Sequence, residues 1–214
     1  MRSFSKFLPI ILIAGFLFQS CIELEEKITI NSDKSGEYSL KLDMGALSSM
    51  GGEVDVPEEL TTFPQIISEG IKDVSGISDI KTNVDEKAGL YQVSFHFQNH
   101  SAFKRALLKL AGMKYGFIVP NYLKVGKHRF KRTNIQPMIA KAIEKSESDF
   151  FTQSFMGTEA TSFINVTTVI ETPKPVKKVK KNGRARKVTD NRVEIKGTLT
   201  EIIKGMDLGV VVKF

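Results

Sequence analysis

The side chains best suited to chemistry in this chain are one cysteine and three histidines, and their spacing argues against a metal centre. His96 and His100 are four residues apart, as two ligands on a helix would be, but they straddle the end of an expected strand and the start of an expected helix. Phe97 stands where a metalloprotease motif would carry its glutamate. His128 lies between two basic residues and is expected to be solvated. We therefore expect no metal site and no cofactor.

The chain also lacks the motifs of the common enzyme classes. None of GxSxG, GxxxxGK[ST], GxGxxG or a paired cysteine motif occurs, so the usual nucleophile and phosphate-loop chemistries have no support. Carboxylates such as Asp33, Glu37 and Asp43 lie on an expected hairpin, where paired acids commonly serve solubility. The sequence therefore predicts a protein that is not an enzyme.

The clearest charge feature is a basic run with no acidic residue between Thr172 and Thr189. The run surrounds Asn182-Gly183, which favours a tight turn, so we expect a basic hairpin. Such a hairpin could attract anionic lipid headgroups or glycans, or it could be a solvated edge whose lysines prevent aggregation. The residues expected to bind an anionic ligand are Lys177, Lys178, Lys180, Lys181, Arg184 and Arg186. A second basic stretch holds Lys124, Lys127, Arg129, Lys131 and Arg132.

The N-terminus has the pattern of an export signal. Arg2 and Lys6 precede an uncharged run of 12 residues from Phe7 to Phe18. A helix that crosses the hydrocarbon core needs about 20 apolar residues, so the run favours a signal peptide over a permanent membrane span. We assign residues 1–20 to this signal.

The single cysteine follows directly, after the small Ser20, and here the sequence resembles the lipobox of bacterial lipoproteins. Phe18 and Gln19 stand where a Leu and a small residue are usual, and this looser form is similar to the lipoboxes of Bacteroidota. The resemblance implies cleavage before Cys21, acylation of Cys21 and anchoring to membrane lipid. The alternative is a secreted protein with a free thiol, which would be a liability in an oxidising compartment.

The residues after Cys21 bear on location. The stretch from Ile22 to Glu26 lacks the aspartate that resembles an inner-membrane retention signal, which favours the outer membrane, on its periplasmic or surface face. Residues 21–25 are then a lipidated tether. We expect no nucleic acid partner, because export removes the protein from the cytoplasm and the basic runs lack aromatic stacking residues.

Composition indicates one ordinary globular domain over residues 26–214. Of the 214 residues, 41% are hydrophobic and 26% charged, which argues against a mostly disordered chain or a polytopic membrane protein. One cysteine excludes an internal disulfide framework. The formal charge of +7 makes the whole chain mildly basic.

Hydrophobic periodicity predicts the elements of this domain. Alternating segments predict two hairpins, each followed by a helix, and the second helix is expected to be capped by Ser101. A third helix is expected from Asn134, and alternation returns in the final third, up to a terminal strand at 208–214. The predicted fold class is α+β, with an antiparallel sheet built from N- and C-terminal hairpins and helices packed on one face.

This layout, from the INSDKSGEYSL hairpin with its N-x-D-x-S-G turn to the terminal strand, is similar to the domain of LppM-like bacterial surface lipoproteins. The resemblance implies a binding or envelope-maintenance role, with a lipid ligand conceivable, and supplies no functional residue. We therefore expect a membrane-anchored envelope lipoprotein that is a non-catalytic binding module for anionic lipid or glycan. The alternative is a structural or assembly component that docks another envelope protein. An open apolar cavity beside the basic hairpin would favour lipid binding, and a flat apolar patch would favour docking.

Overall fold

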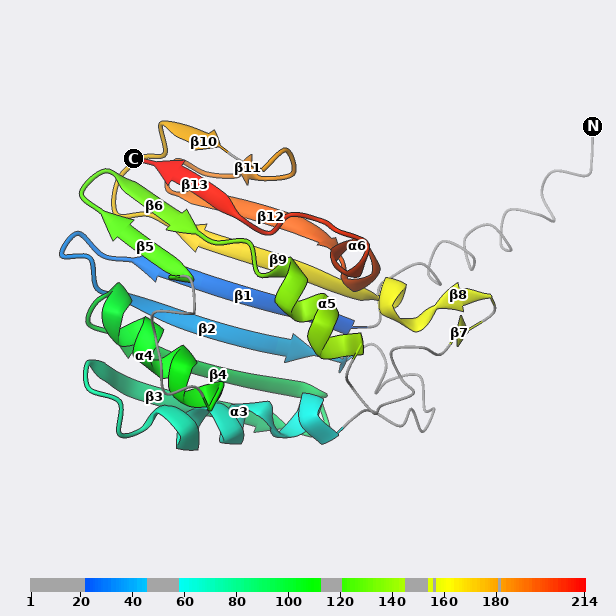
Figure 1. Cartoon of the computed structure of the whole chain (residues 1–214). Coiled ribbons are helices and arrows are strands. Elements are labelled where there is room, and N and C mark those ends of the chain that lie inside the picture. Colours follow the sequence, from blue (N-terminus) through cyan, green and yellow to red (C-terminus); the bar gives the residue numbers. More distant parts are fainter. Residues whose placement is uncertain (1–21, 46–57, 113–120, 145–153, 156, 181) are drawn as a thin grey trace, which may run out of the picture.

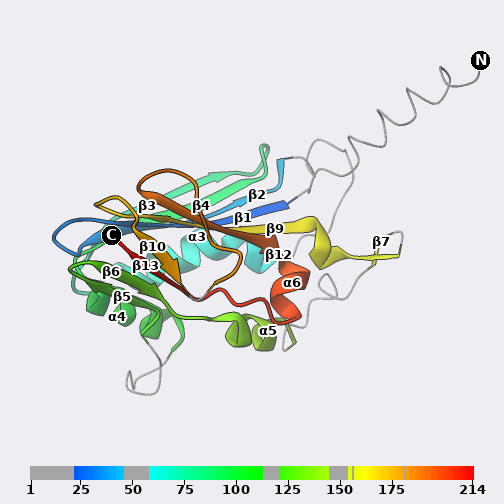
Figure 2. The same cartoon turned by 90° about the horizontal axis from the view of Figure 1, so that it is seen from above.

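The computed structural model describes residues 22–45, 58–112, 121–144, 154–155, 157–180 and 182–214. These residues form two layers (Figures 1 and 2). The back layer in Figure 1 is a seven-stranded sheet, and the front layer holds the helices and a four-stranded sheet. The predicted α+β class is confirmed, while the arrangement of the sheets differs from the prediction.

The large sheet has the strand order β11-β12-β9-β1-β2-β4-β3. Its strands are β1 (Ile22–Ile30), β2 (Gly36–Asp43), β3 (Ile77–Asp85), β4 (Leu90–Phe97), β9 (Ile164–Glu171), β11 (Arg186–Lys187) and β12 (Arg192–Thr198). The small sheet has the order β10-β13-β6-β5. Its strands are β5 (Leu123–Gly126), β6 (Arg129–Arg132), β10 (Lys178–Lys180) and β13 (Val210–Lys213).

The remaining elements are short or helical. The helices are α3 (Glu58–Ile71), α4 (His100–Leu110), α5 (Gln136–Glu144) and α6 (Leu199–Ile203), with a 3-10 turn η3 (Ala160–Phe163). Two further strands, β7 (Ser154–Phe155) and β8 (Thr158–Glu159), pair with each other. Figure 2 shows the four helices on one side of the large sheet, which we call its inner side.

Both predicted N-terminal hairpins are present, β1 with β2 and β3 with β4. The expected tether is wrong for residues 22–25, because β1 begins at Ile22 and these residues pair with β2 and β9 inside the large sheet. In the first turn, the Asp33 carboxylate accepts hydrogen bonds from the backbone N–H and the hydroxyl of Ser35, at 3.0 and 2.6 Å. Lys34 takes a left-handed backbone with φ of 74°. An aspartate that satisfies its own turn is a common way to close such a loop, so the N-x-D-x-S-G pattern here has a local structural role.

Alternation along the strands separates a buried inner face from a polar outer face. In β1, Ile28 and Ile30 are buried, while Lys27, which points to the opposite face, is partly exposed. On the outer face, charges are neutralised by opposite charges, as in the ion pairs Lys27–Glu171 at 3.1 Å and Lys196–Glu194 at 2.9 Å. The outer face therefore carries several ion pairs, and the inner face carries the second layer.

The prediction of one antiparallel sheet that joins the N- and C-terminal strands is wrong in two respects. β1 pairs with β9 in parallel, with Ile28 opposite Ile170, so the large sheet is mixed. The last strand, β13, lies in the small sheet between β10 and β6. Alternation shows which side of a strand is buried but does not name its partner. The long connection from β1 to β9 makes parallel pairing possible.

The basic segment is not a hairpin either, which corrects a second prediction. β10 pairs with β13 and β11 pairs with β12, so the chain crosses here from the small sheet to the large one. Val176 and Ala185, which are 6% and 8% exposed, belong to the main core. Because these two side chains are buried, the pairing of β10 with β13 and of β11 with β12 is favoured over the pairing of β10 with β11.

The observed helix ends differ in part from the predicted ones. Asn99, and not Ser101, caps α4: its side-chain oxygen accepts hydrogen bonds from the backbone N–H groups of Ser101 and Ala102, both at 3.0 Å. The helix α3 continues through Pro64. The last helix, α6, begins with a capping box, in which Thr198 and Glu201 are bonded reciprocally.

The core consists of two clusters of buried side chains. The larger lies between the two sheets and α4, where the Phe103 ring packs against Tyr38, Phe95, Phe97 and Tyr122 with centroids 5.2 to 5.9 Å apart. The smaller lies at the other end of the large sheet and contains Ile22, Leu42, Met44, Tyr91, Ile164 and Leu199. Residues of both clusters line the cavity described next.

Candidate functional site

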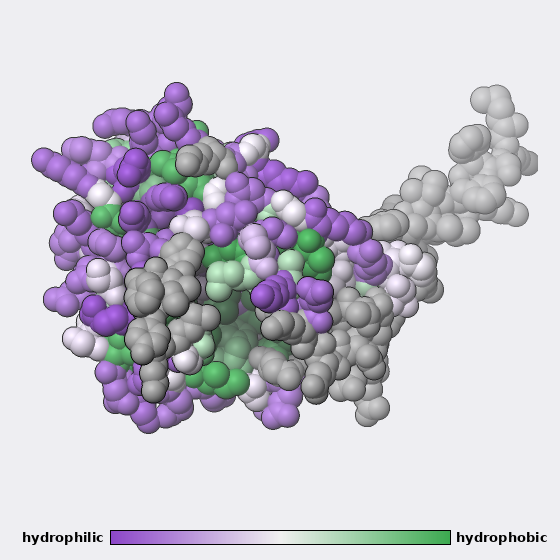
Figure 3. All heavy atoms as spheres, viewed as in Figure 1, coloured by the Kyte–Doolittle hydropathy of each residue, from purple (hydrophilic) through white to green (hydrophobic). Residues whose placement is uncertain are grey.

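A cavity of about 550 Å³ lies against the inner face of the large sheet. Its floor comes from β1, β2 and β9, and its sides come from the C-terminal part of α4 and from α5 with the residue before it. Figure 3 shows apolar residues lining a hollow in the face seen in Figure 1. The apolar lining is made by Leu24, Leu40, Val166, Leu107, Leu108, Leu110, Ile135, Met138 and Ile139.

These apolar side chains occupy inward positions and yet are only partly buried. Leu24 and Leu40 alternate with outward polar residues, but neither reaches the full burial of Ile28 or Leu42 on the same strands. On α5, Met138 is 54% exposed. Uncovered apolar surface on the inner side of a sheet is costly unless something occupies the space, so the cavity is a candidate ligand site.

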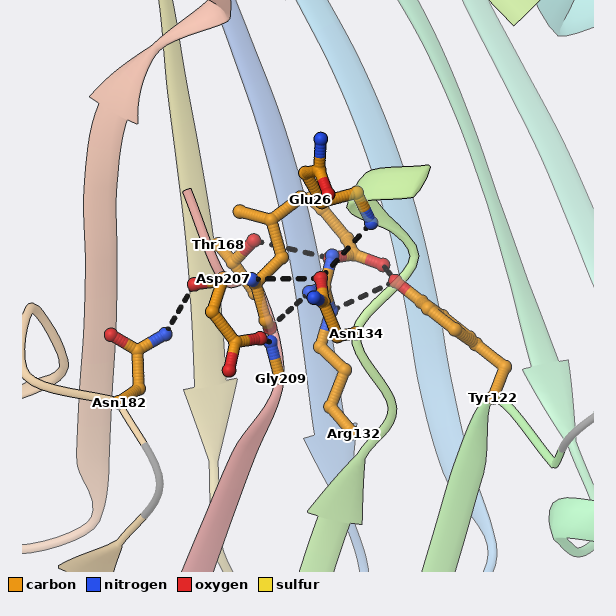
Figure 4. A network of polar contacts seen from close by, with 10 residues as sticks. Glu26, Tyr122, Arg132, Asn134, Thr168, Asn182, Asp207 and Gly209 are labelled. Carbon is orange, nitrogen blue, oxygen red and sulfur yellow. Dashed lines mark hydrogen bonds and ion pairs between the residues drawn. The ribbon is translucent and has the colours of Figure 1, made fainter. Parts of the chain in front are cut away.

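One wall of the cavity carries a buried ion pair between Glu26 and Arg132 (Figure 4). Glu26 comes from the middle of β1 and Arg132 from the end of β6, and their Oε2 and Nη2 atoms are 2.6 Å apart. Their side chains are 8% and 3% exposed. Burial of two charges beside an apolar cavity carries a large desolvation cost, which good geometry must offset.

Tyrosine and threonine hydroxyls complete this network. The Tyr122 hydroxyl donates to Glu26 and accepts from Arg132 Nε at 2.8 Å, and the Thr168 hydroxyl donates to Glu26 Oε2 at 3.2 Å. The guanidinium carbon of Arg132 also lies 5.1 Å from the centre of the Tyr122 ring. Side chains from β1, β6, β9 and the residue before β5 therefore meet in this network.

The segment before β13 fixes Arg132 from its other side. Arg132 Nη1 donates to the backbone carbonyl of Leu208. The backbone N–H of Leu208 in turn donates to the side-chain oxygen of Asn134 at 3.1 Å. Asp207 caps the same turn by accepting from the Gly209 N–H at 2.6 Å, and its carbonyl accepts from Asn182 at 2.8 Å (Figure 4). The guanidinium is therefore held at the cavity wall by backbone as well as side chains.

The protonation states of this wall are well defined. Burial raises the pKa of the Tyr38 phenol well above its ordinary value, and the nearby Glu26 charge raises it further. Burial likewise raises the pKa of Tyr122. Burial opposes the charge of Arg132, but Glu26 and Tyr122 outweigh it and raise the pKa of the guanidinium. Both phenols therefore keep their protons and Arg132 keeps its charge near neutral pH.

Of the residues expected to bind an anionic ligand, those that the structure describes do not line this cavity. Lys177, Lys178 and Lys180 are exposed at β10 in the small sheet. Arg184 pairs with Glu201 at 2.8 Å, and the register places Arg186 opposite Glu194 on the outer face of the large sheet. Lys181 and Cys21 lie outside the described residues. The structure thus distributes these basic residues over two layers.

Sequence reasoning did not single out Glu26 as a site residue and gave Arg132 only as a member of the second basic stretch. A signal was present for both: Glu26 stands at an inward position between Leu24 and Ile28, and Arg132 shares the inward side of β6 with Phe130. A charge at an inward position of a strand requires a buried partner. The identity of the partner could not be read from the chain, since Glu26 and Arg132 are far apart in sequence.

His96 and His100 lie on different elements of the fold. His96 lies on the outer face of β4, opposite Glu37 and Ser78, and His100 begins α4. Among the described residues, no group of three or more His, Cys, Asp or Glu side chains is arranged to hold a metal ion.

Comparisons with known proteins find only distant likenesses, among solved structures. No family model and no curated protein matches. The folded domain of LppM from Mycobacterium tuberculosis, solved by NMR, is similar at 12% identity and a TM-score of 0.39, over 91% of this chain and 90% of that one. A likeness of this strength transfers neither ligand nor functional residue. Within the described part of the chain, no helix has the length and apolar character needed to cross a membrane.

Proposed function

We propose that this protein is a non-catalytic binding module of the cell envelope that holds the apolar part of a lipid in the cavity beside Glu26 and Arg132. The observation that carries this proposal is the cavity itself, whose volume of about 550 Å³ falls within the roughly 300–1,000 Å³ of small-ligand sites. Each CH₂ group buried against its apolar walls contributes about 0.8 kcal/mol, so an acyl chain is the natural occupant.

The polar wall supports a ligand that also carries a hydrogen-bonding group. A guanidinium has five N–H groups. Among the described residues, Arg132 Nε donates to the Tyr122 hydroxyl, Nη1 donates to the Leu208 carbonyl, and Nη2 forms the ion pair with Glu26. A few fixed polar groups in an apolar site commonly set the orientation of the ligand. Arg132 and the neutral phenols would orient a hydroxyl, ester or acid group of the lipid.

The apolar lining favours lipid over glycan, and exposed side chains offer little for the docking alternative. The large hydrophobic residues that stand exposed in the described ranges are Ile66, Met138 and Val188, and they belong to three separate parts of the chain. Docking through an apolar surface needs a contiguous patch. The alternative therefore stays without a specific supporting observation.

Filling the cavity tests the proposal. The double substitution Leu40→Phe/Val166→Phe adds bulk at two inward floor positions, and the matched control Lys41→Phe/Thr167→Phe adds the same rings at the neighbouring outward positions. Binding of N-phenyl-naphthylamine, whose fluorescence rises in apolar surroundings, should weaken about tenfold or more only in the cavity variant, because the rings exclude apolar contacts worth about 0.8 kcal/mol per CH₂.

Both variants keep the same N-terminal apolar run, so any dye that binds to this run contributes equally to the fluorescence of the two variants. Thermal melts should show that the cavity variant stays folded, since its new rings enter empty space. Equal dye binding by the two folded variants would refute the cavity as the ligand site.

We further propose that the chain is anchored through acylated Cys21, at the outer membrane. The motivation is the position of the only cysteine, directly after the short apolar run. Mass spectrometry of the mature N-terminus should find Cys21 as the first residue with acyl chains attached, and Cys21→Ala should release the protein from the membrane fraction. An unmodified Cys21 or a retained Met1 would contradict this anchor.

A further inference from the structure

The two basic stretches of the sequence meet on the outward face of the small sheet. Strand register places Lys178 opposite Lys213, and Lys213 opposite Arg129. The next row places Lys180 opposite Val211, Val211 opposite Lys131, and Lys131 opposite Lys124. The inward residues of the same strands, such as Phe130 and Val212, are fully buried, so the rows just described point away from the large sheet. We call Lys124, Arg129, Lys131, Lys178, Lys180 and Lys213 the basic face.

Nothing within the four strands neutralises the basic face. The strands read LKVG, RFKR, KVK and VVVK, without an acidic residue. None of the six side chains takes part in an ion pair within the described ranges. The outer face of the large sheet is the internal contrast, because there Lys27, Lys41, Arg192 and Lys196 all have acidic partners.

Protection of sheet edges does not account for this pattern. Lysines on β5 and β10 would blunt the two edges of the small sheet. Lys213, Arg129 and Lys131, however, lie on the two inner strands, where no edge needs protection. Like charges directly opposite each other destabilise a sheet, so the chain bears a cost that an anionic partner would remove.

We propose that the basic face docks on the surface of an anionic lipid bilayer. The face of a four-stranded sheet spreads its charge over an area about 14 Å across between its outer strands, and a headgroup layer also presents its charge over an area. Basic residues near such a surface contribute about 1 kcal/mol each. The basic face also points to the same side of the molecule as the apolar hollow in Figure 3. On β6, Lys131 faces outward while its neighbour Arg132 faces the cavity, so docking would bring the cavity close to lipid.

Vesicle flotation of the full chain tests this docking. Vesicles of phosphatidylcholine alone are compared with vesicles in which part of it is replaced by phosphatidylglycerol. The N-terminal apolar run can bind both, so the basic face is measured by the difference between them. In the variant Lys124→Gln/Lys131→Gln/Lys178→Gln/Lys180→Gln, the preference for the anionic vesicles over the neutral ones should fall about tenfold or more. The preference of the wild type should fade in about 1 M salt, where the Debye length is about 3 Å.

The matched control is Lys27→Gln/Lys41→Gln/Lys81→Gln/Lys196→Gln, which removes the same charge from the large sheet and should keep the preference. Equal loss in both variants would overturn the proposal, because net charge and not the basic face would then be responsible. A wild type that binds dextran sulfate but shows no preference for anionic vesicles would overturn it too. Dye binding in vesicle-free solution stays unchanged in both variants, so failure here is separable from failure of the cavity proposal.

Discussion

Replacing Arg132 with methionine is expected to lower the free energy of unfolding by about 3–5 kcal/mol, because the change leaves the Glu26 charge buried without its partner. The loss includes the contacts of Arg132 with Tyr122 and with the Leu208 carbonyl, which tie β6 to the segment before β13. Chemical denaturation followed by circular dichroism measures the effect.

A double-mutant cycle isolates the ion pair from the rest of the network. Glu26→Gln/Arg132→Met should recover much of the stability lost by Arg132→Met alone, since no unpaired charge then stays buried. An Arg132→Met variant within about 1 kcal/mol of the wild type would show that water or ligand reaches this wall freely. If the double variant folds, its affinity for a lipid that carries a polar group beside its acyl chain should fall, while its affinity for a pure hydrocarbon should change less.

Deletion of Leu208–Phe214 is expected to abolish cooperative unfolding. β13 lies between β10 and β6, and Val210, Val212 and Phe214 are 1%, 0% and 3% exposed. Without this strand β10 loses its pairing partner, and Arg132 loses the carbonyl that it meets. A shallow or absent thermal transition in calorimetry is the predicted result.

A single substitution in the same strand provides the control for that deletion. Lys213→Ala removes an exposed side chain from β13 and should change stability by no more than about 0.5 kcal/mol. A truncated protein that melts like the wild type would show that β13 contributes nothing to the core.

Local patterns in the chain were sufficient for much of the fold. The two N-terminal hairpins followed from alternation with a period of two and from the Asp33 turn. The capping box at Thr198 and Glu201 could be recognised because both partners lie within one turn of helix. The cap of α4 was misplaced by two residues, since Asn99 and Ser101 are both good capping types and only the backbone geometry chooses between them.

The candidate sites depended on pairings that no local pattern encodes. Leu40 and Val166 could be assigned to inward positions, but whether a neighbour covers them is decided by α4 and α5. The partner of Glu26 lies on β6, in another layer. The two basic stretches appeared as separate surface runs, and only the register of β13 between β10 and β6 joins them into one face.

The sequence by itself determined the apolar side of the alternating N-terminal strands, the Asp33 turn, the capping box of the last helix and which residues carry charge, because these properties depend on neighbours a few residues apart. The tertiary structure alone decided that β1 lies parallel to β9, that Arg132 is buried against Glu26 while Lys131 beside it faces solvent, and that an apolar cavity stays open between the layers. Strand pairing and the filling of space are set by residues far apart in the chain, since burial and ion pairing stabilise whichever long-range arrangement satisfies them together.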